Sequence, residues 1–233
     1  MPLHGPIVSL RAMKQLLLIC AVVMSQSVLA ADKKPLIADP IIEKAIRKEL
    51  KKPIDELTEA DLIKIKHLNL RGKELTDLRS LTGLSELEVL SLGNNKVEDL
   101  SALKHLSKLK ELRLDGNRLN NINTLPELDH LNALFLENNT ISDLRPILRL
   151  KSLTNLSVGG YNQNDFDTIW KLNNLKVLSI SGSGLNNQQL AVVANELPDL
   201  KHLFICHNPK ISNLLTLATF KKLEMLDVDD RPN

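Results

Sequence analysis

A leucine pattern repeats along most of the chain, and it constrains the fold more than any other feature. Five leucines, from Leu87 to Leu175, follow one another at intervals of 22 residues, and further copies begin at Leu200 and Leu223. Apolar residues alternate with period two in the first half of each unit and recur every third residue in the second half. The first half therefore predicts a short strand with one buried face, and the second half predicts a tight helical or extended turn.

One such unit cannot bury its own leucines, whereas stacked units can, and their strands then form a parallel sheet. The pattern LxxLxLxxN, with further leucines every three residues, resembles the leucine-rich repeat family and is close to its bacterial internalin-like 22-residue class. The resemblance covers residues 65–230 and eight strand segments. It implies an α/β solenoid, a right-handed leucine-rich repeat horseshoe with a concave parallel β-sheet. A coiled coil is excluded because the sequence has no heptad.

An asparagine follows the strand half of several units. Its carboxamide can donate and accept hydrogen bonds, so we expect it to be buried and to pair with backbone groups that the turn leaves unsatisfied. Other units carry Lys73, Tyr161 and Ser183 at this position, so their turns must differ. The predicted structural asparagine ladder consists of Asn95, Asn117, Asn139 and Asn208.

Helical signals precede the repeats and also interrupt them. Asp39 and Pro40 suit a helix start that Pro53 ends, and Thr58 opens a second start. Residues 31–64 resemble the N-terminal cap of bacterial leucine-rich repeat proteins, which implies that they cover the first coil of a repeat domain over 65–233. In the longest unit, residues 186–197 predict a convex helix, and Trp170 before it is either exposed or partly buried.

The predicted cap carries a basic face with two possible explanations. The face is either a solvated helix surface, with Glu43 and Arg47 as an ion pair one turn apart, or a contact with an anionic surface such as lipid headgroups. Both explanations stay open from the sequence. The basic residues concerned are Lys44, Arg47, Lys48, Lys51 and Lys52.

Residues 1–30 have the features of a secretory signal peptide. Arg11 and Lys14 precede a short apolar stretch, and small residues lead to Ala30, after which we expect cleavage. The apolar stretch is far shorter than the ~20 residues that span a bilayer. We therefore expect an exported protein, periplasmic or secreted, whose translation starts at Met1 or Met13.

The net charge of the chain restricts the class of partner. The chain has a formal net charge of +2, and removal of residues 1–30 leaves equal numbers of basic and acidic residues. A nucleic-acid partner is therefore not expected.

Lipid attachment at Cys20 is disfavoured because Ile19 before it is not small. Cleavage leaves Cys206 alone, so no internal disulfide is expected, and the reactivity of its thiol stays open.

The concave sheet face is the expected binding surface. Positions 3, 5 and 7 of each unit point away from the leucine core, and eight strands make a face ~34 Å long, which suits a peptide or protein. A phenylalanine on such a face suggests a binding anchor, although the aromatic content of 3% argues against a tight adhesin. The predicted binding residues are Glu111, Arg113, Asp115, Phe135, Glu137, His202 and Phe204.

The sequence does not predict an enzyme, a metal site or a cofactor. His202 and Cys206 would lie ~13 Å apart along one strand, too far to share a metal or a proton. Asp227 and Asp229 lack the glycine loop of a calcium site. The sequence therefore favours an exported module that binds a protein or peptide. The alternative is a cell-envelope structural or carbohydrate-recognition protein.

Overall fold

The computed structural model describes residues 35–160 and 165–228. Residues 35–38 belong to a separate N-terminal unit, and the chain from Asp39 onward is one compact unit. The expected signal peptide with its cleavage after Ala30, the ladder position of Tyr161, and Asp229 lie outside the described residues.

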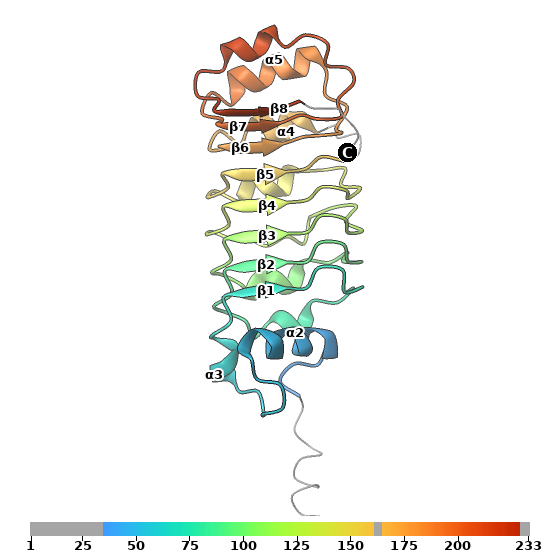
Figure 1. Cartoon of the computed structure of the whole chain (residues 1–233), viewed down its shortest axis with the longest axis vertical. Coiled ribbons are helices and arrows are strands. Elements are labelled where there is room, and N and C mark those ends of the chain that lie inside the picture. Colours follow the sequence, from blue (N-terminus) through green and yellow to red (C-terminus); the bar gives the residue numbers. More distant parts are fainter. Residues whose placement is uncertain (1–34, 161–164, 229–233) are drawn as a thin grey trace, which may run out of the picture. The chain divides into compact units, whose positions relative to one another are not determined.

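Eight strands of three residues form one parallel sheet in chain order (Figure 1). This stack of coils is the predicted leucine-rich repeat solenoid. Each coil carries one strand, so that neighbours in the sheet are consecutive in the sequence. The strands are β1 (His67–Asn69), β2 (Val89–Ser91), β3 (Glu111–Arg113), β4 (Ala133–Phe135), β5 (Asn155–Ser157), β6 (Val177–Ser179), β7 (His202–Phe204) and β8 (Met225–Asp227).

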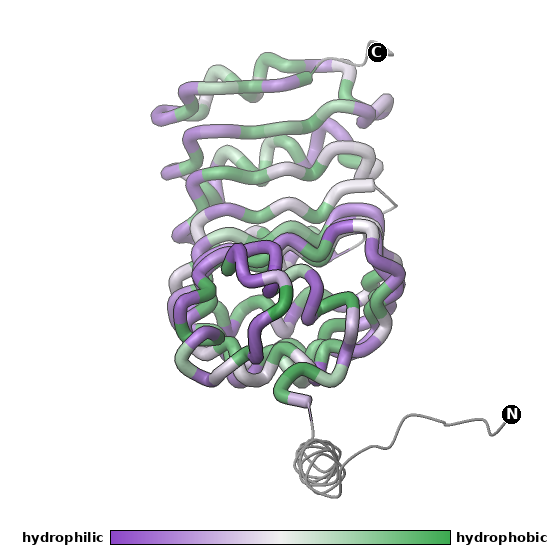
Figure 2. Tube along the Cα trace, turned by 60° about the horizontal axis from the view of Figure 1, so that its bottom comes forward, coloured by the Kyte–Doolittle hydropathy of each residue, from purple (hydrophilic) through white to green (hydrophobic). Residues whose placement is uncertain are grey.

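The sheet register follows directly from the 22-residue repeat. Leu90 lies beside Leu68 on one side and beside Leu112 on the other, and all three are buried. Hydrophobic and hydrophilic stretches follow one another along the coils that Figure 2 shows separately. In β2 and β3 the central leucine is buried and the residues on either side of it are more exposed, as a half-buried strand requires. Burial of the leucines inside the stack is therefore shared between neighbouring coils.

The second half of each coil returns the chain to the next strand. Leucines spaced by three residues point inward here, as Leu100, Leu103 and Leu106 show with no exposed surface. A 3₁₀-helix repeats every three residues, which matches this spacing. Four coils carry one: η1 (Arg79–Leu81), η2 (Ser101–His105), η3 (Arg145–Arg149) and η4 (Leu215–Thr219).

The residue before the ladder position has a left-handed backbone in seven successive coils. Such a conformation favours glycine, and asparagine tolerates it better than most residues. His207, at φ 56°, is the one member of the set that is neither. The sequence therefore contains a second periodic signal, which the leucine spacing does not reveal. The set is Gly72, Asn94, Gly116, Asn138, Gly160, Gly182 and His207.

Within the described residues, two helices precede β1. In α2 (Pro40–Leu50) the Asp39 carboxylate accepts hydrogen bonds from the N–H groups of Ile41 and Ile42, at 2.8 and 3.0 Å. Ile42 and Ile46 are completely buried, and α2 contacts β1. A short helix, α3 (Glu59–Leu62), then leads into the first coil. The proline-capped start that the sequence predicts is thus present.

Two coils replace the tight turn with an α-helix. In α4 (Phe166–Trp170) the rings of Phe166 and Trp170 stack with centroids 5.5 Å apart, and Trp170 is 7% exposed. Of the two alternatives for Trp170, the structure therefore has the buried one. The predicted convex helix is α5 (Asn187–Glu196), where Asn186 and Gln189 cap the first turn reciprocally.

Candidate binding face

The residues that flank the central leucine of each strand point to one face of the sheet, here called the concave face. Two aromatic side chains lie on it, Phe135 in β4 and Phe204 in β7, and both are half-buried. Ser157 and Ser179 lie between them in register. With strands ~4.8 Å apart, the two phenylalanines are ~14 Å from each other. On this row of the concave face, two serines therefore lie between two aromatic rings.

Three of the predicted binding residues form one cluster across β3 and β4. The Arg113 guanidinium lies over the Phe135 ring, 4.3 Å from its centroid. Its Nε donates to Oε1 of Glu111 at 2.6 Å. A cation over an aromatic face, held by a carboxylate, keeps both side chains in place before any partner arrives. The cluster presents an aromatic edge and a guanidinium together.

An ion pair crosses the turn beside this cluster. Arg71 Nη1 lies 2.6 Å from Asp115 Oδ2, although the two residues belong to coils separated by a third. The intervening coil has Gly93 at this position, and a Cβ on Gly93 would overlap both side chains. Because Gly93 has no side chain, the side chains of Arg71 and Asp115 can reach each other across its coil.

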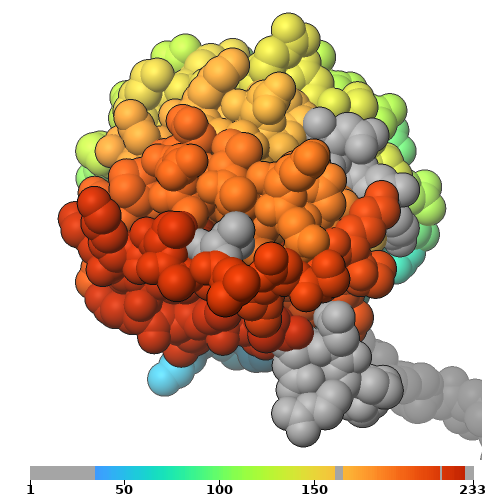
Figure 3. Space-filling view, turned by 90° about the horizontal axis from the view of Figure 1, so that it is seen from above, coloured from blue at the N-terminus to red at the C-terminus, as the bar shows by residue number. Residues whose placement is uncertain are grey.

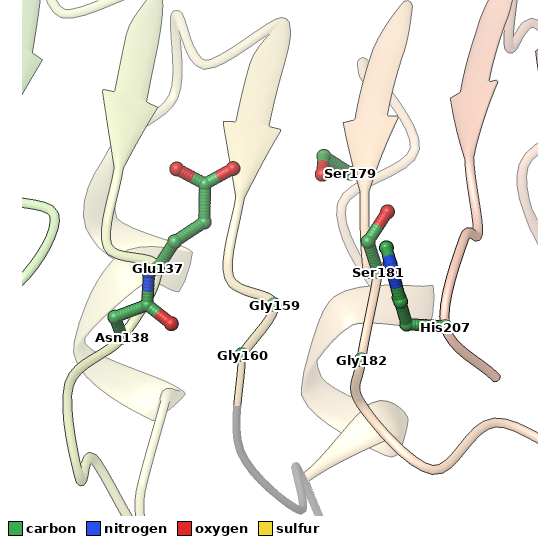
Figure 4. A pocket seen from close by; sticks show the side chains of 8 residues that line it. All are labelled: Glu137, Asn138, Gly159, Gly160, Ser179, Ser181, Gly182 and His207. Atoms are coloured by element: carbon green, nitrogen blue, oxygen red, sulfur yellow. The ribbon is translucent and has the colours of Figure 1, made fainter. Parts of the chain in front are cut away.

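A hollow of about 360 Å³ lies two coils beyond Asp115. In Figure 4, Glu137 and Ser181 stand on either side of Gly159, which has no side chain to place between them. The Glu137 carboxylate accepts a hydrogen bond from the Ser157 hydroxyl. The residues that line the hollow are Glu137, Asn138, Gly159, Gly160, Ser179, Ser181, Gly182 and His207.

Most of these lining residues were missed by the sequence prediction, which included only Glu137. The signal that could have found them is the pair of small residues at positions 7 and 8 of two adjacent units, Gly159-Gly160 and Ser181-Gly182. These glycines let neighbouring coils approach closely, since a Cβ on Gly159 would overlap the Ser181 backbone and a Cβ on Gly160 would overlap Asn138.

The remaining predicted binding residues lie apart from the β3–β4 cluster. His202 and Phe204 are on β7, and His202 Nε2 lies 3.9 Å from Oε2 of Glu224. His202 is half-buried, as is Cys206 in the same coil. Within the described part of the chain, no group of three His, Cys, Asp or Glu residues could hold a metal ion.

Each asparagine of the predicted ladder is buried and bonded to backbone groups of two coils. Asn117 Oδ1 accepts from the Val97 N–H at 2.9 Å, and its Nδ2 donates to the carbonyls of Leu92 and Leu114 at 2.9 Å each. A carboxamide satisfies a donor and two acceptors that would otherwise be buried without partners. Equivalent bonds are made by Asn95, Asn139 and Asn208.

Ser183 occupies the ladder position of its coil without taking over this role. It is 2% exposed, and its hydroxyl has no hydrogen-bond partner among the described residues. A serine side chain is too short to reach the groups that an asparagine reaches. The ladder is therefore interrupted at this coil and resumes at Asn208.

The basic residues around α2 fall into two groups. Arg47 binds Glu43 at 2.8 Å and the carbonyls of Lys52 and Asp55, and Lys52 binds Asp61 at 2.8 Å. These two side chains hold the N-terminal helices together. The exposed ones are Lys44, Lys48 and Lys51, which line a second, shallow hollow of about 690 Å³ with Arg47.

Asp61 is the most strongly perturbed acid of the described chain. Hydrogen bonds from Lys52, Thr58 and Lys64 hold the pKa of its carboxyl well below the usual range. The perturbation belongs to the connection around α3, because the partners of Asp61 are Lys52 and Thr58 before this helix and Lys64 after it. It does not indicate a catalytic group.

Comparison with known proteins gives one family and a set of similar structures. A family model described as leucine-rich repeats in two copies matches residues 63–105 and 85–130. Internalin C2 from Listeria monocytogenes is 26% identical, with a TM-score of 0.63, over 84% of this chain and 97% of its own. Among curated proteins, a sequence search finds no match.

Two further structures show the same fold. The internalin InlF from Listeria monocytogenes is 24% identical, with a TM-score of 0.59, over 86% of this chain and 72% of its own. A leucine-rich repeat protein from Leptospira interrogans is 29% identical, with a TM-score of 0.54, over 73% of this chain and 44% of its own. Scaffolds of this kind commonly mediate protein binding and are typically not enzymes. No helix in the described residues is long and apolar enough to cross a membrane.

Proposed function

Because the chain belongs to the leucine-rich repeat family and has internalin-like coils, we propose that it is an exported protein that binds a protein or peptide on its concave face. The observation that carries this proposal is the cluster of Glu111, Arg113 and Phe135. A preorganised aromatic and an arginine are the side chains that most often dominate the binding energy of protein interfaces. The cluster lies beside a hollow of small polar residues, which gives a partner both an anchor and a recess.

Photocrosslinking tests where the partner binds. A photoreactive phenylalanine analogue replaces Phe135 in the cell that produces the protein, and a matched probe replaces Lys104, which is exposed on η2 away from the sheet. We expect a discrete adduct from position 135 alone that contains peptides of a second protein by mass spectrometry, and loss of that adduct on adding Arg113→Ala. Equal adducts from both positions, or none from position 135, would contradict binding on the concave face.

The export part of the proposal rests on residues 1–30. Their basic start, apolar stretch and small residues up to Ala30 are the three parts of a secretory signal peptide. We expect the mature protein to begin at Ala31 and to fractionate outside the cytoplasm. N-terminal sequencing of the purified protein tests this, and an intact N-terminus on cytoplasmic protein would refute it.

Carbohydrate recognition in the cell envelope is the second candidate. Hydroxyl groups of Ser179 and Ser181 and the carboxylate of Glu137 line the Gly159 hollow, and such groups also bind sugars. The same crosslinking experiment separates the two candidates. An adduct whose added mass is removed by glycosidases and contains no peptide of a second protein by mass spectrometry would favour the second.

A further inference from the structure

The concave face has two sites where a glycine separates polar side chains of the flanking coils. At the first, Gly93 lies between Arg71 and Asp115, whose side chains meet at 2.6 Å. At the second, Gly159 lies between Glu137 and Ser181. All of these residues occupy position 7 of their units, so the two sites have the same place in the repeat.

The two sites differ in charge balance. The carboxylates of Glu111 and Asp115 each pair with an arginine of this chain. Among the ion pairs of the described residues, Glu137 has none, and its hydrogen bond comes from the neutral hydroxyl of Ser157. The coil beyond Gly159 offers Ser181 where the first site has a charged partner. The second site therefore has a carboxylate at the hollow but lacks the cation, and Gly159 itself packs closely against the Ser181 backbone, which a Cβ would overlap.

We propose that the hollow at Gly159 receives a basic side chain of the partner, an arginine guanidinium or a lysine ammonium, with Glu137 as its counter-ion. This inference rests on the proposed function and specifies the partner's chemistry. Of the lining residues, Glu137 is the one acid, and neither lysine nor arginine is among them. The hydroxyls of Ser179 and Ser181 provide further acceptors on the opposite wall.

The shape of the hollow suits a guanidinium in particular. About 360 Å³ is at the small end of ligand pockets, enough for one side chain rather than a whole cofactor. A guanidinium presents five N–H donors in a plane, which matches a carboxylate on one side and hydroxyls on the other. Phe135, two residues before Glu137, places an aromatic anchor nearby. The partner segment is thus expected to have a basic residue next to an apolar one.

Nuclear magnetic resonance titration tests the charge requirement with defined probes. Nα-acetyl-argininamide is added to the purified protein, and Nα-acetyl-citrullinamide, its neutral analogue of nearly the same shape, is the matched control. We expect saturable shifts of the Gly159, Gly160 and Gly182 amides with argininamide only. Glu137→Gln should weaken this binding by about tenfold or more, which is the effect of losing one charge-assisted hydrogen bond. Glu127→Gln, at an exposed acid that does not line the hollow, should leave it unchanged.

A second variant tests the relation between the two sites. Arg71→Ala removes the cation of the first site and leaves the Asp115 carboxylate beside Gly93, in the coil that follows its glycine, whereas Glu137 is in the coil that precedes Gly159. Argininamide should then bind there as well and shift the Gly93 amide, and Arg71→Ala with Asp115→Asn should abolish that second response. This readout needs no knowledge of the natural partner.

The outcomes separate this inference from the proposed function. Equal response to both probes, binding that survives Glu137→Gln, or preferential binding of N-acetylglucosamine would overturn the cation site. So would the absence of any argininamide response at Gly159. If concave-face crosslinking persists in that case, the proposed function stands and only its cationic specificity fails. If argininamide binds but no crosslink forms from position 135, the cation site stands and the proposed function fails.

Discussion

The first and last coils of the sheet share one sequence pattern but have different environments. Leu68 and Leu70 in the β1 coil are 3% and 0% exposed, whereas their equivalents in the β8 coil, Leu226 and Val228, are 36% and 37% exposed. Helix α2 contacts β1, and no described helix or strand follows β8. Figure 3 shows the molecule from the end of the stack at which β8 lies. The comparison teaches that a coil's leucines are buried by its neighbours, because one coil is too thin to enclose them.

The largest expected effect comes from truncating the same leucine at the two ends. Leu68→Ala should lower the free energy of unfolding by ~2–5 kcal/mol, since it leaves a cavity between packed coils. Leu226→Ala should cost less than ~1 kcal/mol, because its side chain is already partly in water. Urea denaturation of both variants measures the difference. Equal costs would mean that the β8 coil is covered in solution, which would remove the contrast.

The ladder position allows a second comparison, between a coil that has asparagine there and a coil that has serine. Asn117→Leu should destabilise the protein by ~1–3 kcal/mol, because the Val97 N–H and the carbonyls of Leu92 and Leu114 lose their partner. At the interrupted position, Ser183→Ala should change stability by no more than ~0.5 kcal/mol, since it removes a hydroxyl that has no partner among the described residues. Thermal melts test both, and an unchanged melt for Asn117→Leu would refute the structural role.

Acid should loosen the N-terminal end of the protein. The folded-state pKa of Asp61 is depressed by Lys52, Thr58 and Lys64, so its stabilising contribution is complete above the ordinary aspartate pKa of 3.8 and is lost as the pH falls toward the folded value. Hydrogen exchange of α3 amides should therefore rise below about pH 4. In Asp61→Asn this acid-dependent rise should be absent. A rise of the same size in that variant would show that other carboxyls cause it.

The smallest effect is expected at the exposed end itself. Leu215, in η4, is 80% exposed, so Leu215→Lys should shift the unfolding free energy by no more than ~0.5 kcal/mol. The same change should raise solubility, because it breaks the apolar surface around β8. A matched Leu103→Lys in η2, where Leu103 is completely buried, should prevent folding. A large loss of stability from Leu215→Lys would show that the Leu215 side chain is buried in solution, which would contradict its exposure in the structure.

The repeat itself was predictable because its signal is redundant. Strand positions, parallel order and the buried asparagine position each recur in several units, so an irregular unit does not hide the pattern. The helix starts at Asp39 and Asn186 were also predictable, since a cap acts through the backbone of the next turn. Trp170 was not predictable, because its burial depends on stacking with Phe166 across one helical turn.

The binding face was predictable as a surface but not as a site. The period-two alternation placed Glu111, Arg113 and Phe135 on one face, yet it could not show that they contact one another. His202 and Phe204 were predicted with them, and they lie three strands away. The hollow at Gly159 depends on side chains that are absent, and a missing side chain is a weak signal in a single sequence.

The sequence by itself determined the coil, its 22-residue period and the direction in which each residue points, because these depend on local spacing and on backbone groups within the unit. Only the tertiary structure decided which carboxylates are neutralised. Arg71 reaches Asp115 across an intervening coil, while the described hydrogen bond to the Glu137 carboxylate comes from the neutral Ser157 hydroxyl. The physical reason is that electrostatic balance depends on distances between coils, and stacking alone sets those distances.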